Sequence, residues 1–281
     1  MLITVITHVR AYTQVDLPPV YLNHMFIALD ENSYRNLLKN TFLKDSFSLH
    51  STDTSVTTTE TYYGTYLWGN NSYFELFPPK GYNAAANGGF GLCFMTYTVG
   101  DISKTKNQIK KNTKDSIVEE TSSLLYNDTA YPSFNQLYFF QKDSVRAITT
   151  WIMEYTPSLY KNAGFSDEEI KQKMSRAQFL EKMDRQKYSK AFDHISKVEM
   201  IINNEDYAYL NKSLTSFGLK KIGSNFFNPD VKIICTVKPN VITHLKSIET
   251  ELLGSFSAQT IKISDKLTLK IDGKKAKWIF N

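Results

Sequence analysis

Residues 22–30 (LNHMFIALD) and 62–77 (YYGTYLWGNNSYFELF) decide the fold that the sequence predicts. The apolar run Leu22–Leu29 is typical of a strand, and Asp30 after it is a good N-cap for a helix at 31–44, where apolar residues recur at helical spacing. The next three predicted strands cover residues 55–63, 64–68 and 72–77. This block therefore has the order strand, helix, three strands.

The same order of elements is expected again further along the chain. A second set begins with a strand at 90–97 and a helix at 101–113, and ends with strands at 134–141 and 147–155 joined by a turn at 142–144. A charged amphipathic helix at 166–188 leads into a third set. That set has predicted helices at 205–217 and 241–253, and strands at 198–202, 220–227, 231–237, 260–263, 267–271 and 277–280. The sequence thus predicts an α+β fold of repeated βαβββ modules with curved mixed sheets.

The expected domain organisation follows from these blocks. It comprises a tail or export-segment remnant at 1–15, paired modules at 16–160, a linking helix at 161–190 and a third α+β module at 191–281. The apolar start Met1–Thr7 is short and has no basic residue before it, so it fails as a complete signal peptide. If it is the remnant of a longer export segment, a periplasmic or secreted location is favoured; otherwise the protein is expected in the cytoplasm.

Composition and charge narrow the classes of partner. The formal net charge is +5, but the lysines are mixed with acids in helical stretches such as 104–114 and 168–190, which indicates a solvated face rather than a nucleic-acid site. No apolar run approaches the ~20 residues of a membrane-spanning helix. Cys93 and Cys235 each lie in an apolar run, where a buried cysteine acts as a small hydrophobe. A disulfide bond between them is the alternative. No cluster of Cys and His predicts a zinc site.

The last strands of the first two sets resemble each other. Residues 72–78 (SYFELFP) match 150–157 (TWIMEYTP) when Glu75 and Glu154 are each placed three residues before a proline. Aromatic residues surround both glutamates. The match is modest evidence for an internal duplication, because it agrees with the order of elements on both sides.

At these residues the chain resembles an uncharacterised bacterial family related to glyoxalase-like proteins of the vicinal oxygen chelate superfamily. In that superfamily the first strand often begins with a His, and the last strand of a module carries a Glu among apolar residues. Here His24 lies in the first strand, and Gly64-Thr65 precedes the strand that contains Glu75. The resemblance covers about 21–157, and the third module only through its order of elements.

The resemblance implies a metal site in a cup formed by paired modules. His24, Glu75 and Glu154 would hold a divalent metal such as Zn, Fe, Mn or Ni, and Glu75 or Glu154 would act as a catalytic base. The first strand of the second module offers no His, Gln or carboxylate as a fourth ligand. An aromatic set would line a ligand pocket or, equally, pack as core: Tyr63, Tyr66, Trp68, Tyr73 and Trp151.

Three functions are compatible with these residues. The first is a metal-dependent lyase, isomerase or dioxygenase that acts on a small oxygen-rich molecule. The alternative is a non-catalytic protein that binds a small ligand on the same fold and keeps no metal. The third is an interaction protein whose exposed sheet pairs with another subunit, as in a homodimer. The missing fourth ligand favours the second, and the His/Glu/Glu set favours the first.

Overall fold

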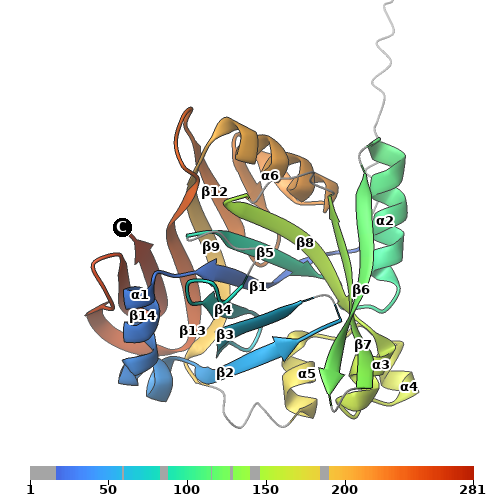
Figure 1. Ribbon diagram of the computed structural model, residues 1–281, viewed down its shortest axis with the longest axis horizontal. Coiled ribbons are helices and arrows are strands. Elements are labelled where there is room, and N and C mark those ends of the chain that lie inside the picture. Colours follow the sequence, from blue (N-terminus) through green and yellow to red (C-terminus); the bar gives the residue numbers. More distant parts are fainter. Residues whose placement is uncertain are drawn as a thin grey trace, which may run out of the picture.

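The computed structural model of the chain contains mostly strands, arranged in two mixed sheets, with short helices around them (Figure 1). It describes residues 17–58, 60–82, 88–114, 116–126, 129–139, 146–183 and 190–281. The predicted tail at 1–15 and the predicted turn at 142–144 lie outside these residues. The α+β class is confirmed. Of the described residues, no helix combines the length and the apolar character that crossing a membrane requires.

The first half of sheet A is built from one run of the chain. Its elements are β1 (Tyr21–Ala28), α1 (Glu31–Lys39), β2 (Leu49–Val56), β3 (Thr61–Trp68) and β4 (Tyr73–Phe77). Asp30 caps α1 as expected, because its Oδ1 accepts hydrogen bonds from the backbone N–H groups of Asn32 and Ser33. The helix ends five residues earlier than expected, and a π-helical turn, Leu43–Phe47, follows it.

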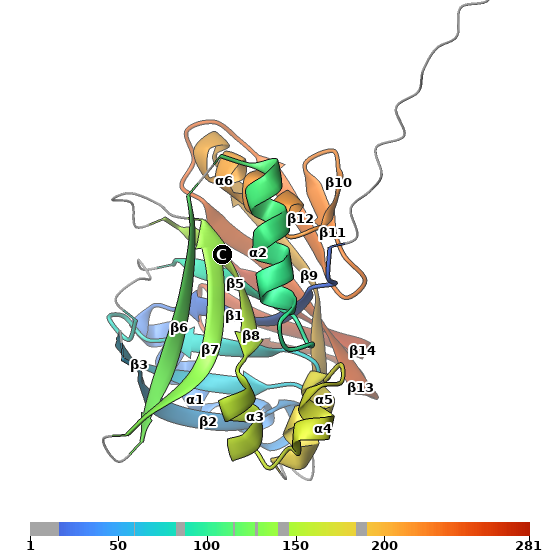
Figure 2. The ribbon, with the colours of Figure 1, turned by 90° about the vertical axis from the view of Figure 1, so that its right-hand side faces the viewer.

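The second half of sheet A repeats this order. Its elements are β5 (Phe90–Met95), α2 (Asp101–Asn112), β6 (Ile117–Tyr126), β7 (Thr129–Phe139) and β8 (Ile148–Tyr155). The hydrogen-bonded order is β2-β3-β4-β1-β5-β8-β7-β6, so the two halves mirror each other about the antiparallel pair β1 and β5. The sheet curls into a half-barrel (Figures 1 and 2). A single bridge from Thr57 to Leu124 links its two margins.

The segment after β8 forms three short helices rather than the one long helix expected at 166–188. They are α3 (Pro157–Asn162), α4 (Asp167–Ile170) and α5 (Arg176–Lys182). Ser166 and Ser175 each begin a helix with a capping box, made with Glu169 and Gln178 respectively. Two N-caps nine residues apart start two helices, which is why the amphipathic spacing did not give one.

Sheet B contains the C-terminal elements. They are β9 (Phe192–Ile202), α6 (Asn204–Ser216), β10 (Lys220–Ile222), β11 (Asn225–Phe227), β12 (Lys232–Val237), β13 (His244–Lys262) and β14 (Leu267–Phe280), in the order β10-β11-β12-β9-β13-β14. The expected helix at 241–253 was wrong, because residues 244–253 belong to β13. Ile248, Thr250 and Leu252 are buried in alternation with two glutamates, the period of a strand, and a register shift before Ser247 disguised it.

The two sheets share a large apolar core. Met25, Phe74 and Leu92 from sheet A lie in the same buried cluster as Val198, Ile248 and Trp278 from sheet B. Residues from α1, α2 and α6 join this cluster on the same side of sheet A. Side chains alternate along a strand, so the neighbouring residues of sheet A point to its other side. We call that other side, which carries His24 and Cys93, the inner face.

A second, smaller core closes one end of the inner face. It joins Cys93 and Met153 of the inner face to Tyr160 of α3, to Phe179 of α5 and to Met174, which precedes α5. The backbone N–H of Met174 donates to the carbonyl of Tyr97 at 2.7 Å, which ties this segment to the chain after β5. Figure 2 shows α3, α4 and α5 grouped beyond the ends of β7 and β8. Helix α5 is therefore in position to place a side chain on the inner face.

Candidate functional site

The structure brings His24 and Glu75 together on the inner face. In the parallel pair of β1 and β4, His24 lies beside Tyr73 and Phe26 lies beside Glu75. Residues that are paired across strands, and every second residue along them, share a face, so all four side chains lie on the inner face. The His24 Nε2 atom is 3.8 Å from Glu75 Oε2. Two of the three predicted metal ligands therefore lie next to each other.

His24 is held in one orientation and without charge. Its Nδ1 lies 2.8 Å from the Asn23 Oδ1 atom, and since that oxygen only accepts, Nδ1 carries the hydrogen and Nε2 keeps a free lone pair toward Glu75. The ring stacks on Tyr73 at 4.6 Å between centroids and meets Trp151 edge-on. Burial, together with the positive charge of Arg176, lowers the pKa of His24 to about 3. The imidazole is therefore neutral at physiological pH.

Glu75 is also uncharged at neutral pH. Burial raises the pKa of its carboxyl to about 8, and the Tyr73 hydroxyl at 3.5 Å and the charge of Arg176 oppose this rise only in part. The contact between His24 and Glu75 is therefore a meeting of two neutral groups rather than an ion pair. A protonated carboxyl can donate a hydrogen bond or a proton, and the facing Nε2 can accept one. The Glu75 side chain keeps 13% of its surface exposed, so a ligand can meet it.

A third polar group, Arg176, reaches the same place from α5. Only 2% of this residue is exposed. The guanidinium carbon lies 4.2 Å from the ring centre of Tyr73 and 5.1 Å from that of Trp68, which are cation–π distances. Its Nε and Nη2 atoms are buried and have no hydrogen-bond partner among the described residues. Unmet donors on a buried charge are costly, which marks this position as unusual.

Aromatic rings surround these three groups. Trp68 lies 4.5 Å from Tyr73 and stacks on Tyr66 at 5.2 Å, while Phe26 packs 6.0 Å from Trp151. Four of the five predicted pocket residues, Tyr66, Trp68, Tyr73 and Trp151, thus lie on the inner face. The fifth, Tyr63, points away and is 43% exposed. Its neighbour Tyr62 takes the inner position instead and meets Phe77 edge-on.

Two glycines let the aromatic rings lie close against the strands. A Cβ at Gly91 would be 2.2 Å from the Phe26 ring and 2.8 Å from the hydroxyl of Thr149. A Cβ at Gly64 would be 2.8 Å from the Phe77 ring. A Cβ atom does not come this close to non-bonded atoms in proteins, so the rings occupy the space that a side chain would need. The aromatic floor of the inner face depends on these two positions.

Glu154, the other predicted catalytic and metal-binding residue, does not join this group. It lies three positions from Trp151 along β8, so it points to the opposite side of sheet A. There it accepts hydrogen bonds from Thr96 Oγ1 at 3.0 Å and from the backbone N–H groups of Gly100 and Ile102 at 2.9 Å. Glu154 therefore fastens the beginning of α2 to the sheet.

The three predicted metal ligands do not lie together in the structure. In the part of the chain that the structure describes, no group of three or more His, Cys, Asp or Glu residues could hold one. His24 and Glu75 supply two donors, Glu154 lies on the other side, and the positive charge of Arg176 acts on both donors. The fixed positive charge of Arg176 beside these donors disfavours the binding of a metal cation. Cys93 faces the same region but is buried, and burial raises the pKa of its thiol. Cys93 and Cys235 are free thiols.

Comparisons with known proteins give a family and a fold. A model described as a family of unknown function (DUF5829) matches residues 22–280. The chain belongs to this family. The DUF5829 fold is similar to that of a hypothetical protein from Staphylococcus aureus, whose crystal structure has a TM-score of 0.55 with 15% sequence identity. The match covers 87% of this chain and 96% of that one. The comparison with curated proteins gave no match. Neither match names a glyoxalase, so these comparisons leave that resemblance a hypothesis.

An apolar hollow lies on the other side of sheet A in this DUF5829 protein, away from the polar groups. Its lining comes from both sheets and α1: Ile27, Leu29, Leu37, Leu67, Phe74, Leu76, Leu267, Trp278 and Phe280. It offers packing space but no acid, base or cation. The chemistry therefore belongs to the inner face.

Sequence reasoning missed several residues of this site. Asn23 and Tyr62 are next to residues that were considered, and strict strand alternation from His24 and Tyr66 would have found Tyr62. Tyr155, whose side chain forms a hydrogen bond with Arg176, follows from Trp151 in the same way. Arg176 gave no local signal, because it reaches the site from a helix 152 positions after His24 along the chain.

Proposed function

We propose that this DUF5829 protein binds a small planar organic molecule on the inner face of sheet A and does so without a catalytic metal. The observation that carries the proposal is the pair of Glu75 and His24. Both are buried, both are held uncharged, and their facing donor and acceptor atoms are 3.8 Å apart, too far for a hydrogen bond with each other. Polar groups left this way in a protein interior generally have a functional partner.

The aromatic surroundings support a planar ligand. Trp68, Tyr66 and Trp151 present ring faces or edges next to the polar pair, and Trp68 and Trp151 remain partly exposed. Ligand sites typically combine apolar and aromatic walls with a few polar groups that fix the orientation. The inner face has this composition.

The strand order supports placing this protein with the glyoxalase-like proteins. Each half of sheet A has the order strand, helix, three strands, and the two first strands lie side by side at the centre. In our proposal the curled sheet forms the cup of such a protein, and its ligand occupies the place that the resemblance gives to the metal. Function is argued from the residues rather than from this likeness, because one fold hosts many functions.

The metal-dependent lyase, isomerase or dioxygenase is the weaker candidate. It requires Glu154 beside His24 and Glu75, and Glu154 instead holds the start of α2. It also requires a cation next to the guanidinium of Arg176. The binding protein needs neither condition.

Fluorine NMR of protein labelled with 5-fluorotryptophan tests the proposal. The three signals are assigned by single Trp→Phe substitutions and followed during titration with benzamide, a neutral planar aromatic probe. We expect saturable shifts of the Trp68 and Trp151 signals, while the signal of Trp278, which lies in the core between the sheets, stays in place. Equal movement of all three signals, or no movement at any benzamide concentration, would contradict the proposal.

A further inference from the structure

Among the residues that the structure describes, Arg176 has no counter-ion at neutral pH. None of the ion pairs among the described residues includes it, although every other Arg among those residues has one. The positive charge of Arg176 acts on Glu75, which is protonated because burial keeps its pKa at about 8. A fully buried guanidinium without an anion is rare in folded proteins, since the charge is costly to remove from water.

The geometry of Arg176 leaves one buried edge of the guanidinium without hydrogen bonds to the described residues. Its face is occupied by Tyr73 and Trp68, at 4.2 Å and 5.1 Å from the ring centres. Its Nε and Nη2 atoms, which lie along one edge of the planar group, find no acceptor among the residues that the structure places. This pair of N–H groups matches the two oxygens of a carboxylate.

We infer that the ligand of the inner face carries a carboxylate, which binds in bidentate fashion to the Nε and Nη2 edge of Arg176. This inference rests on the proposed function and adds the chemical class of the ligand. The planar body of the ligand packs against the aromatic side chains, and its carboxylate supplies the missing counter-ion. Trp68, which contacts the guanidinium, is partly exposed and marks the side from which the ligand approaches.

A neighbouring carboxyl strengthens the assignment. Protonated Glu75 does not repel an incoming carboxylate and can donate a hydrogen bond to it, whereas an ionised Glu75 would compete with it for Arg176. Neutral His24 adds an acceptor and no second positive charge. The three groups together therefore favour one monoanion rather than a polyanion.

The experiment compares benzoate with benzamide, which has almost the same shape and no charge. Both are titrated into wild type by isothermal calorimetry, with the fluorotryptophan signals as a second readout. We expect benzoate to bind at least about tenfold more tightly than benzamide, since a charge-assisted bidentate contact is among the strongest polar contacts. Arg176→Met, which keeps an apolar chain as far as the Nε position and removes the guanidinium, is expected to abolish this difference. Arg35→Met, at an exposed arginine of α1, is expected to keep it.

Each outcome separates the inference from the proposed function. Equal binding of benzoate and benzamide to wild type, with shifts of the Trp68 and Trp151 signals, would overturn the carboxylate inference and leave the binding proposal standing. Failure of both probes would overturn both. Binding of inorganic phosphate without binding of benzoate would show a site for a small inorganic anion and overturn the inference. The wild-type comparison decides the matter even if Arg176→Met does not fold.

Discussion

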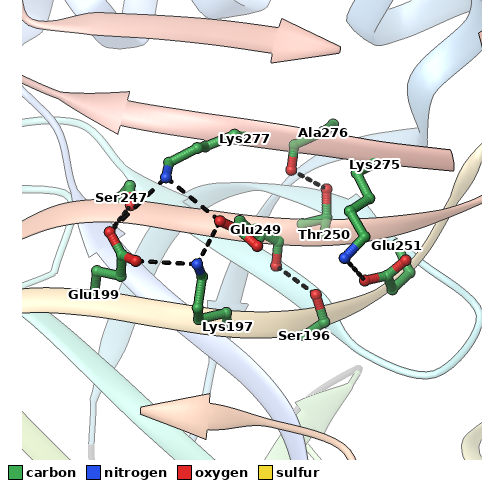
Figure 3. Close-up of polar contacts among 10 residues, drawn as sticks. All are labelled: Ser196, Lys197, Glu199, Ser247, Glu249, Thr250, Glu251, Lys275, Ala276 and Lys277. Atoms are coloured by element: carbon green, nitrogen blue, oxygen red, sulfur yellow. Dashed lines mark hydrogen bonds and ion pairs between the residues drawn. The ribbon is translucent and has the colours of Figure 1, made fainter. Parts of the chain in front are cut away.

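Both sheets carry charged residues, but they treat them in opposite ways. On sheet B a ladder of side chains crosses β9, β13 and β14, and Figure 3 shows each charge beside an opposite one. Lys197 lies 3.0 Å from Glu199, and Lys277 lies 3.4 Å from Glu249. On the inner face of sheet A, Arg176 has no anion, and Glu75 and His24 avoid charge altogether.

Burial explains the difference. The side chains of the ladder are 18–63% exposed, so water and neighbours both solvate them. Although burial alone would raise it, the pKa of Glu199 is lowered by hydrogen bonds from Ser247 and Lys197. Paired, hydrated charges are satisfied by the protein itself. The polar groups of the inner face are not paired in this way, and that contrast is the basis for our proposal that a ligand binds there.

The largest expected effect concerns Glu154, which is buried like Glu75 but fully bonded. Glu154→Ala removes three hydrogen bonds and leaves backbone N–H groups at the start of α2 without acceptors. We expect a loss of about 3–5 kcal/mol in the free energy of unfolding, measured with urea at pH 7. Benzoate binding to the folded fraction should be unchanged. A loss below about 1 kcal/mol would mean that Glu154 is not the structural anchor described.

The second prediction tests how tightly the inner face is packed. Gly91→Ala places a methyl group 2.2 Å from the Phe26 ring, so we expect a loss of about 2–3 kcal/mol, measured by urea unfolding. Gly254→Ala is the matched control in a strand of sheet B, where the nearest atom, on Phe256, would be 3.7 Å away. It should change stability by less than about 0.5 kcal/mol. Equal effects at the two glycines would show that the rings of sheet A can move aside.

The third prediction uses pH. Between about pH 4.5, the ordinary pKa of Glu, and about pH 8, unfolded chains lose the Glu75 proton while the native protein keeps it. The native state binds more protons here, so this residue makes the protein less stable as pH rises. Glu75→Gln cannot ionise and should gain about 2–4 kcal/mol over wild type between pH 5 and pH 9, measured by urea unfolding. Titratable or charged groups around Glu75 are His24, Glu60, Tyr62, Tyr66, Tyr73, Tyr82, Cys93 and Arg176.

The pH difference has its own control. His24 acts in the opposite direction, because its pKa is lowered from 6.5 to about 3 and its contribution increases stability as pH rises through that range. His24 is present in both wild type and Glu75→Gln, so its contribution cancels when the free energies of unfolding of the two proteins are subtracted. Glu154→Gln makes the same chemical change at a carboxylate that accepts three hydrogen bonds, so it should lower stability at pH 9 rather than raise it. A gain of the same size there would contradict the account.

The smallest effect is expected on sheet B. Lys277→Met removes one member of the ladder, whose side chain is 39% exposed. Because Lys197 still neutralises Glu199 and Glu249, we expect a change within about 0.5 kcal/mol, and less at high salt. Urea unfolding at two salt concentrations measures it. A loss above about 2 kcal/mol would mean that the ladder acts as a network and that exposure alone does not separate the two sheets.

The sequence predicted more of sheet A than of the rest. Apolar and aromatic runs bounded by turn or proline signals predicted β1, β4, β5 and β8. The alternation of side chains along β1 and β4 is what brings His24 and Glu75 together. The helix expected at 241–253 was wrong because a register shift hides the alternation of β13. A register shift changes which face each residue joins, and a pattern read at the wrong period then points to the wrong element.

The same rule explains which site residues were misplaced. Aligning Glu75 with Glu154 by their distance to a proline ignored that Trp151 and Glu154 are three positions apart, so they cannot share a face in one strand. Tyr63 and Tyr66 are also three positions apart in one strand, so they cannot share a face either. Arg176 could not be predicted, because its role arises from where α5 packs and not from any spacing in its own segment.

A direct titration of Glu75 tests the central claim. Protein labelled with carbon-13 at the glutamate carboxyl is followed by NMR from pH 4 to pH 10, and the Glu75 signal is assigned as the one missing in Glu75→Gln. We expect its midpoint near pH 8, because the carboxyl is buried without a permanent partner. A midpoint near 4.5, the ordinary value, would show that Glu75 is ionised at neutral pH and pairs with Arg176, and would contradict the account.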